Sequence, residues 1–563
     1  MADRRSASLH AVHDAFLQRG FRRSFSGADI AYTGSLDETG LKVPVVVSLD
    51  DFEFITPPKI RLLNHDVKSR GHIPHVLRSD GTLCYLAPGT VVLDRYKPAQ
   101  TIIQCLEIAD RVIRDAVRGR LDGDIAVELA QYWTDGIVFV DLPPDFERDA
   151  KIHLVTFDRE QTVERPLAST GDSPFLLLHE RCTGKEPAPK FLCPVVRVPT
   201  LYFDPKQPWP PKTLKDLNDW LSVVAPAAVG QLEQAFARTS DDYRQWICLS
   251  APNGRFFIMA EIPQAYRTPE ILKNRRLRIG AFLKRISGLV SISAHAGVSI
   301  DEGYVFSRNL GGMNHLAGKR ILLIGCGTIG GFLSQQLVQS GAGTGGGRLT
   351  IVDDDDLMGA NLGRHLLGTP FLGRNKADAC ADFLKEQLPY ADVRSVSHSI
   401  TSDLDLIFRS DLVINATGEE ALSIALNELA VAQRPNSPPL LFTWIEGNGA
   451  ATVSFLCGDP ERACYKCLKT DLARAPRYQL GRRDVSIEYG QVRSCADMHF
   501  IPYPVSRAAA AAGLACDMVL DWAAGTLTHT WRSQTLDHRL ANRVKDCNPK
   551  KVESCPACGG NLE

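Results

Sequence analysis

The chain has 563 residues, with 64 lysines and arginines against 65 aspartates and glutamates. This length exceeds what one hydrophobic core supports, and the balanced charge gives no bulk attraction to nucleic acid or to an anionic membrane. Because no apolar stretch reaches the roughly eighteen residues that cross a bilayer, and the N-terminus lacks the apolar core of a signal peptide, the sequence predicts a cytoplasmic protein of several domains that binds neither nucleic acid nor membrane.

The N-terminal part of the chain predicts an α+β domain over residues 1–144. Its first 24 or so residues have the apolar spacing of an amphipathic helix. The alternating runs AYTGSL, VPVVVSL and DFEFITPPKIRLL predict a small antiparallel sheet. A loop-rich stretch over 64–98 then leads into a helix over 99–119.

Proline-rich segments mark the predicted start of a middle domain over residues 145–304. The composition changes at DLPPDFERD, and similar patches recur at EPAPKFLCP and DPKQPWPPKT. Strand-like runs such as KIHLVTF and RFFIMAEI occur with helix-like runs such as TLKDLNDWLSVV, which predicts an α/β domain. No cluster of polar residues there indicates catalysis, so we expect this domain to act as a linker.

Residues 305–563 follow a strict β-α-β order, which predicts a Rossmann-like, doubly wound sheet. RILLIG is typical of a buried parallel strand, 330–340 of a helix, and RLTIVD and SDLVINAT of later strands. Between the first strand and the helix, Gly325, Gly327 and Gly330 form a loop whose backbone N–H groups suit a phosphate. The loop alone leaves open whether the phosphate belongs to a dinucleotide or to ATP.

The residues after the second strand favour ATP. Asp353 follows the loop by about 20 residues, where a carboxylate accepts hydrogen bonds from a ribose. Asn361, Arg364 and Lys376 come next. Hydride transfer has little use for two such cations, whereas a triphosphate that releases pyrophosphate needs them to neutralise developing charge. The alternative is a solvated acidic turn beside a surface cation.

The segments GCGTIG, VDDDDLMGANLGRH and LGRNKA resemble, in order and spacing, the adenylation domain shared by ubiquitin-activating enzymes and the bacterial adenylyltransferases of thiamine and molybdopterin synthesis. The resemblance implies that Asp353 binds the ribose of ATP and that Asn361, Arg364 and Lys376 contact its phosphates. It also implies that Arg308 reaches into the ATP site of a partner subunit, and hence a homodimer.

Two departures from that family concern the bound Mg²⁺ that the resemblance implies. Gly418, followed by Glu419, stands where the family commonly has a magnesium-binding aspartate. His365 stands where glutamine is usual. The identity of the magnesium ligand therefore stays open.

Two Cys-x-x-Cys pairs flank the last part of the chain, Cys464 with Cys467 and Cys555 with Cys558. The 15 cysteines are an odd number in a long chain, which is typical of a reducing compartment rather than of a disulfide framework. Four thiolates suit a closed tetrahedral Zn²⁺ site of structural type. A redox Cys-x-x-Cys motif is the alternative, which the presence of two pairs disfavours.

Cys495 precedes an alanine-rich helix in the segment VRSCADMHFIPYP, close to Arg493. A helix N-terminus and an arginine lower the pKa of a thiol from its ordinary value of about 8.5. In the resembling activating enzymes that use a cysteine, the cysteine that attacks the acyl-adenylate lies in this part of the domain. A merely buried cysteine is the alternative.

The segments RGHIPHVLRSDGTLCYL and RYKPAQTIIQCLEIADRVI resemble a ubiquitin-conjugating enzyme, in which a His-Pro-Asn turn precedes the acceptor cysteine and a Trp-x-Pro follows it. By this resemblance Cys84 carries the thioester, and Tyr96-Lys97-Pro98 replaces the Trp-x-Pro. The chain has Pro74-His75 in place of Pro-Asn, so the usual oxyanion-stabilising amide is missing. We expect His75 either to donate a hydrogen bond or to act as a general base.

The domain order resembles bacterial fusions of activating and conjugating enzymes found in anti-phage operons. The implied substrates are ATP, a partner protein with an activatable C-terminus and the amines of target proteins. The nearest resemblance is to fusions of cyclic-oligonucleotide defence systems, which conjugate a cGAS-like nucleotidyltransferase. Conjugation of a dedicated ubiquitin-like protein, sulfur-carrier adenylation without conjugation, and NAD-dependent redox chemistry are the alternatives.

Overall fold

The computed structural model describes residues 2–26, 29–36, 42–50, 54–63, 74–77, 80–86, 93–133, 135–157, 163–187, 190–202, 209–239, 243–267, 279–311, 315–471, 475–486, 488 and 501–559. They form two compact units. The first unit consists of Met1–Gly171 and Pro187–Ser299, and the second of Asp172–Glu186 and Ile300–Glu563.

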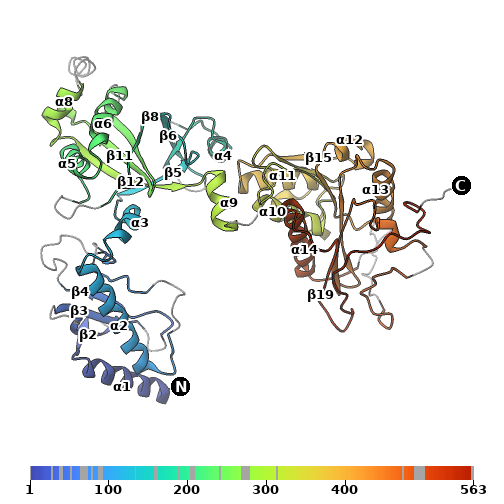
Figure 1. Cartoon of the computed structure of the whole chain (residues 1–563), viewed down its shortest axis with the longest axis horizontal. Coiled ribbons are helices and arrows are strands. Elements are labelled where there is room, and N and C mark those ends of the chain that lie inside the picture. The colour runs from blue at the N-terminus through green and yellow to red at the C-terminus, as the bar shows by residue number, and fades with distance from the viewer. Residues whose placement is uncertain are drawn as a thin grey trace. The chain divides into compact units, whose positions relative to one another are not determined.

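The N-terminal domain is a four-stranded antiparallel sheet with two long helices (Figure 1). Valines at alternate positions of its third strand are buried, because successive strand residues face opposite sides of a sheet. Gly20, at a φ of +78°, follows the first helix, which ends earlier than the sequence predicts. The elements are α1 (Ala2–Gln18), β1 (Arg22–Ser26), β2 (Asp29–Leu36), β3 (Val43–Leu49), β4 (Lys59–Leu62) and α2 (Pro98–Val117), with the strand order β1-β2-β3-β4.

The middle domain is an eight-stranded mixed sheet in the order β8-β6-β7-β5-β12-β11-β10-β9. Its strands are β5 (Gly136–Asp141), β6 (Ala150–Val155), β7 (Arg165–Ser169), β8 (Phe191–Cys193), β9 (Val195–Arg197), β10 (Arg244–Ala251), β11 (Gly254–Glu261) and β12 (Ser291–Ser299). Strand β5 precedes the boundary predicted near residue 145, yet it pairs with β7 and β12, because its alternate valines are buried in this sheet.

Helices cover one face of the middle sheet around a cluster of tryptophans. The rings of Trp133, Trp209 and Trp220 pack with centroids 5.1 to 5.4 Å apart. The helices are α3 (Asp122–Tyr132), α5 (Leu214–Val224), α6 (Pro226–Arg238), α8 (Ile279–Ile286) and the 3-10 turn η2 (Gln264–Tyr266). Helix α4 (Pro174–Thr183) instead groups with the second unit, where the Phe175 ring meets the Tyr390 ring edge-on.

The C-terminal domain is a doubly wound sheet in the order β15-β14-β13-β16-β17-β18-β19. The first five strands of this order are parallel, and the last two are antiparallel. The strands are β13 (Arg320–Ile324), β14 (Arg348–Val352), β15 (Val393–Val396), β16 (Leu412–Asn415), β17 (Leu440–Glu446), β18 (Ala451–Cys457) and β19 (Trp531–Thr535). The chain reverses its winding direction between β13 and β16, and such a switch point is where open α/β sheets bind ligands.

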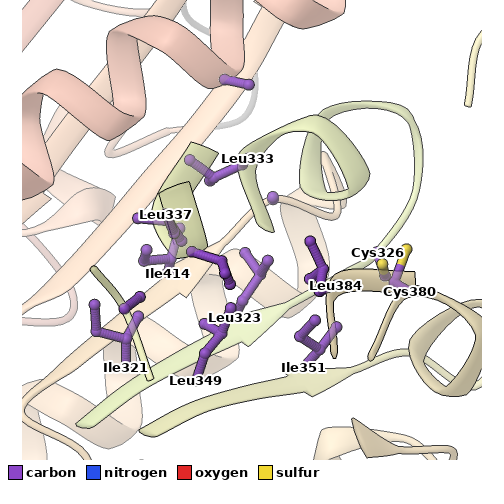
Figure 2. Close-up of a cluster of buried hydrophobic side chains, with 14 of the residues drawn as sticks. Ile321, Leu323, Cys326, Leu333, Leu337, Leu349, Ile351, Cys380, Leu384 and Ile414 are labelled. Atoms are coloured by element: carbon purple, nitrogen blue, oxygen red, sulfur yellow. The ribbon is translucent and has the colours of Figure 1, made fainter. Parts of the chain in front are cut away.

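Apolar side chains of β13 and β14 meet those of α10 in the main core of this domain. Figure 2 shows Leu323 and Leu349 facing Leu333 and Leu337. The helices are α9 (Glu302–Leu310), α10 (Thr328–Gln339), α11 (Lys376–Gln387), α12 (Asp405–Phe408), α13 (Glu420–Ala432) and α14 (Val505–Ala524), with 3-10 turns η3 (Gly359–Asn361), η4 (Thr369–Phe371), η5 (Ile400–Ser402) and η6 (Tyr465–Leu468).

The three predicted fold types, α+β, α/β and doubly wound, are confirmed by these sheets. Within the described ranges, none of the helices combines the length and the apolar character needed to cross a membrane.

Candidate functional site

The glycine loop joins β13 to α10 at the switch point. Gly325 has a φ of +89°, and a Cβ there would lie 2.8 Å from the Thr417 side chain. A Cβ at Gly330 would lie 1.8 Å from the Gly325 carbonyl oxygen, whereas at Gly327 it would meet nothing within 4 Å. Gly325 and Gly330 therefore let the loop pack tightly, and Gly327 leaves open space beside the helix N-terminus, which suits an anion.

Asp353 follows β14, and its side chain is hydrogen-bonded to the glycine loop. Its Oδ2 accepts a hydrogen bond from the Cys326 N–H at 2.6 Å, and its Oδ1 accepts one from the Asp355 N–H at 3.0 Å. Burial raises the pKa of this carboxyl above its ordinary value, although both N–H donors act in the opposite direction. Each carboxylate oxygen has a second lone pair, so Asp353 has acceptor capacity left for a ligand hydroxyl.

Lys376 is the first residue of α11 and is 7% exposed. The Asn375 side chain caps this helix by accepting a hydrogen bond from the Asp378 N–H. The Lys376 ammonium lies 2.7 Å from the Asp355 carboxylate. The helix cap thus fixes a nearly buried cation next to Asp353.

These side chains line a cavity of about 590 Å³ at the carboxyl ends of the parallel strands. Gly325, Gly327, Asp353 and Lys376 all contribute to its lining. Gly330 does not, because it packs against Gly325. Aromatic residues that the sequence analysis missed form a further part of the wall: Phe442, Trp444, Tyr465, Tyr478, Tyr503 and Trp531. Phe442, Trp444 and Trp531 lie in strands, where aromatic residues are typical of a core, so their positions in the sequence give no sign of a cavity.

Asn361 and Arg364 are not among the residues that line the cavity. Asn361 ends η3, and its Oδ1 accepts a hydrogen bond from the Met358 N–H at 2.8 Å. Burial raises the pKa of Tyr503, which lines the cavity and is hydrogen-bonded to Thr328. The positive charge of Arg364 acts in the opposite direction and lowers this pKa. The Arg364 charge thus acts on one residue of the cavity wall without lining the cavity itself.

His365 is buried and neutral beneath the glycine loop. Its Nδ1 accepts a hydrogen bond from the Leu367 N–H at 3.0 Å, which leaves the proton on Nε2, 2.7 Å from the Cys326 carbonyl oxygen. Burial lowers the pKa of the imidazole. Cys326 and Cys380 lie beside it, with their sulfur atoms drawn close together in Figure 2. Because backbone groups occupy both ring nitrogens, His365 offers no lone pair to a metal.

Gly418 and Glu419 both line the cavity. Gly418 has a φ of +75° and carries no donor atom. Glu419 follows it at the start of α13 and is exposed. Gly418 stands where the resembling family commonly has a magnesium-binding aspartate, and Glu419 supplies the carboxylate closest to it in sequence.

The four predicted metal ligands form one cluster, although 91 residues separate the two pairs. The sulfur atom of Cys464 lies 3.8 Å from that of Cys467 and 3.7 Å from that of Cys555. The sulfur atoms of Cys467 and Cys558 are 3.3 Å apart. A tetrahedral Zn²⁺ with bonds of about 2.3 Å requires sulfur atoms about 3.8 Å apart, so the cluster fits zinc.

Arg308 does not belong to the cavity lining. It lies near the end of α9, and its Nη1 donates a hydrogen bond to the Tyr304 hydroxyl at 3.3 Å. Cys495 lies outside the described residues, as does Arg493.

Cys84 is exposed on a short hairpin of the N-terminal domain. Its N–H donates a hydrogen bond to the His75 carbonyl oxygen at 2.7 Å, next to the bridge between Val76 and Leu83. His75 has a φ of +60°, which is rare for a residue with a side chain. Its Nε2 lies 3.2 Å from Oδ2 of Asp124, a residue that the sequence analysis missed.

Two family models match the chain: "ThiF family" over residues 306–557 and "Prokaryotic E2 family B" over residues 7–137. The chain is 31% identical over 590 residues to the ATP-dependent ubiquitin transferase-like protein Cap2 of Pseudomonas aeruginosa, covering 98% of this chain and 99% of that protein. Proteins of the same description from Vibrio cholerae and Escherichia coli are 29% and 26% identical. Those alignments cover 46% and 62% of this chain, and 44% and 60% of the relatives.

Proposed function

The chain belongs to the family of ATP-dependent ubiquitin transferase-like Cap2 proteins, and from this premise we propose that it adenylates the C-terminus of a partner protein and conjugates it to target amines. The family and the two matched domains make the chain an enzyme of the activating and conjugating type.

ATP binds in the cavity at the switch point. Its phosphates lie against the glycine loop and the N-terminus of α10, and its ribose hydroxyl donates to Asp353. A carboxylate oxygen of the partner attacks the α-phosphorus, the bond to the β-phosphate oxygen breaks, and pyrophosphate leaves. Lys376, assisted by Asn361 and Arg364, neutralises the charge that develops on the phosphates.

The carboxylate of Glu419 is the proposed ligand for Mg²⁺. Gly418 offers no donor, whereas Glu419 lines the cavity and supplies the oxygen atoms that Mg²⁺ prefers. When bound, the ion contributes positive charge next to the phosphates. Zn²⁺ has a different role, because four thiolates leave it no open position. Held by Cys464, Cys467, Cys555 and Cys558, it ties η6 to the C-terminal segment.

The acyl group then moves through two thioesters. The Cys495 thiolate attacks the acyl carbon and displaces AMP. The Cys84 thiolate attacks this thioester and displaces Cys495, and a lysine amine finally displaces Cys84. Dividing the transfer in this way gives each step a good leaving group.

For the partner, we favour a cGAS-like nucleotidyltransferase of a bacterial anti-phage system. The support is the domain order and the full-length relationship to Cap2. Such a partner supplies its own C-terminus, whereas a dedicated ubiquitin-like protein, the alternative, requires a separate modifier gene.

The observation that carries the proposal is the convergence of Gly327, Asp353 and Lys376 on one cavity, in a chain that also presents Cys84 on a hairpin of the conjugating type. The test is ATP–pyrophosphate exchange by the full chain with a purified candidate partner. We expect exchange with the free C-terminus and none with the same partner amidated at its C-terminus. Nicotinamide turnover without exchange would support the redox alternative.

A Cys84→Ala variant separates conjugation from sulfur-carrier adenylation. We expect it to retain exchange and to lose all partner–target adducts, because the acceptor thiol is missing. Continued thiocarboxylate formation, with adducts absent in the parent as well, would favour the sulfur-carrier alternative.

A further inference from the structure

The register of the hairpin sets His75 directly opposite Cys84. The Val76–Leu83 bridge and the hydrogen bond from the Leu77 N–H to Thr82 fix this register. The Cys84 N–H also donates a hydrogen bond to the His75 carbonyl oxygen at 2.7 Å, so the backbones of the two residues are in contact. His75 is therefore an immediate neighbour of the residue that carries the proposed thioester.

A carboxylate from another element contacts this imidazole. Oδ2 of Asp124 lies 3.2 Å from Nε2 of His75. Asp124 is in the first turn of α3, and its side chain is 52% exposed against 20% for His75. His75 makes this contact from a left-handed backbone, a conformation that costs free energy and often marks a functional position.

Helix α3 belongs to the middle domain by its packing. Leu129 and Trp133 are fully buried in the core of the eight-stranded sheet. The Trp133 indole N–H donates to the Phe257 carbonyl oxygen at 3.2 Å, and the Asn253 side chain donates to the Ala126 carbonyl oxygen. The helix that carries Asp124 is thus anchored in the domain for which the sequence suggests only a linker role.

We propose that the middle domain completes the conjugating site, with Asp124 as the positioning residue that makes His75 the general base for aminolysis of the Cys84 thioester. This inference rests on the proposed function. When the neutral imidazole donates its Nε2 proton to Asp124, its lone pair is on Nδ1. Of the two roles expected for His75, this arrangement selects the base over the hydrogen-bond donor.

The reaction then runs as follows. Nδ1 of His75 takes a proton from the lysine ammonium, and the nitrogen lone pair that this frees attacks the acyl carbon of the thioester. The further proton that the nitrogen loses after the attack passes to water. The tetrahedral intermediate collapses, the carbon–sulfur bond breaks, and the Cys84 thiolate leaves with the electron pair. The Asp124 carboxylate stabilises the imidazolium until it returns its proton to water.

The test loads Cys84 without ATP, Cys495 or a partner. The full chain carrying Cys495→Ala is acylated by thiol exchange with the mercaptoethanesulfonate thioester of N-acetylglycine. Discharge of the acyl group is then timed with free lysine and, separately, with hydroxylamine. Lysine amines are protonated at neutral pH and need a base, whereas hydroxylamine is already unprotonated.

We expect Asp124→Asn to slow discharge to lysine by roughly ten- to a hundredfold and to leave discharge to hydroxylamine unchanged. His75→Ala should have the same selectivity, and Asp124→Glu should restore part of the rate. Asp115→Asn is the matched control, because it removes a carboxylate of α2 that pairs with Arg120 at 2.7 Å.

Three results would overturn the inference. These are discharge to lysine at the parent rate in Asp124→Asn, equal slowing with both nucleophiles, and failure of Cys84 in the parent to accept the acyl group. Because no adenylation occurs in this assay, a negative pyrophosphate-exchange result would contradict the proposed function and leave this measurement interpretable.

Discussion

Gly327 ends the glycine loop and Gly330 lies in the first turn of α10, and their steric surroundings are opposite. A Cβ at Gly330 would meet a backbone oxygen at 1.8 Å, whereas one at Gly327 would point into open space. Because backbone cannot rotate away, we expect Gly330→Ala to lower the free energy of unfolding by about 1–3 kcal/mol. Gly327→Ala should leave it nearly unchanged and weaken ATP binding by crowding the phosphates. Urea unfolding and calorimetric ATP titration measure the two effects, and equal destabilisation by both variants would contradict this account.

His365 makes the C-terminal domain sensitive to acid. Burial lowers the pKa of His365 from its ordinary 6.5; the Cys326 carbonyl and Asp353 act in the opposite direction, and Lys376 adds to the lowering. The unfolded chain therefore binds this proton at a higher pH than the folded chain. The stability that the neutral histidine contributes is present above pH 6.5 and is lost as the pH falls toward the lowered pKa.

A His365→Gln substitution tests this reasoning, because an amide donates and accepts as the imidazole does but does not titrate in this range. We expect the variant to lose less unfolding free energy than the parent when the pH falls from about 7.5 to about 5.5. Urea unfolding at the two pH values measures the difference. Identical losses in both proteins would show that the titrating group lies elsewhere.

At the scale of single residues, the sequence best predicts candidate site residues that lie close in sequence to a recognisable strand or motif. Asp353 was predicted because it directly follows a recognisable strand, and Lys376 because LGRNKA resembles the family motif. Both line the cavity, and their roles stay predictions. Asp124 could not be found, because 49 residues separate it from His75 and only the packing of α3 brings the two together. For Arg308 and Cys495 the roles stay predictions.

At the scale of elements, hydrophobic periodicity predicts whether a segment is a helix or a strand better than it predicts which strands pair with each other. The alternating runs of the N-terminal domain and the β-α-β order of the C-terminal domain correspond to β2, β3, β13 and α10. Pairing is set by contacts distant in sequence, which periodicity does not contain. The predicted boundary near residue 145 therefore assigns strand β5 to the N-terminal domain. In the structure β5 lies between β7 and β12 of the middle sheet.

The cysteine cluster joins η6 to the C-terminal segment, so its loss should affect both elements. Structural zinc contributes on the order of 10 kcal/mol of folding free energy. We expect Cys558→Ser to abolish stoichiometric zinc and to lower the unfolding midpoint, because a tetrahedral site loses one thiolate. Atomic emission gives the zinc content, and thermal unfolding gives the midpoint.

Cys547→Ser is the control for this experiment. Cys547 is half-buried in the same domain, and its sulfur does not belong to the four-sulfur cluster. We expect this variant to keep its zinc. A parent protein that binds no zinc, or a Cys558→Ser variant that binds as much as the parent, would contradict a structural zinc site.

At the scale of the whole molecule, the open question is whether one chain has a complete ATP site. Arg308 does not line the cavity of its own chain and contacts Tyr304 on its own helix. If Arg308 acts in a partner subunit, Arg308→Ala and Lys376→Ala each inactivate a homodimer, but they do so at different halves of a shared site. A mixed dimer then keeps one site with Lys376 from one chain and Arg308 from the other.

Refolding or subunit exchange of the two variants in equal amounts should therefore restore activity. Random pairing makes half of the dimers mixed, each with one intact site, so we expect about a quarter of the parent rate of pyrophosphate exchange. Neither variant alone should exceed background, and a chain carrying both substitutions, mixed with either variant, should restore none, because no pairing then unites the two side chains. A mass measurement shows whether the mixtures contain mixed dimers. If mixed dimers form and activity does not recover, Arg308 acts in the site of its own chain. Recovery without dimers would exclude the shared-site mechanism altogether.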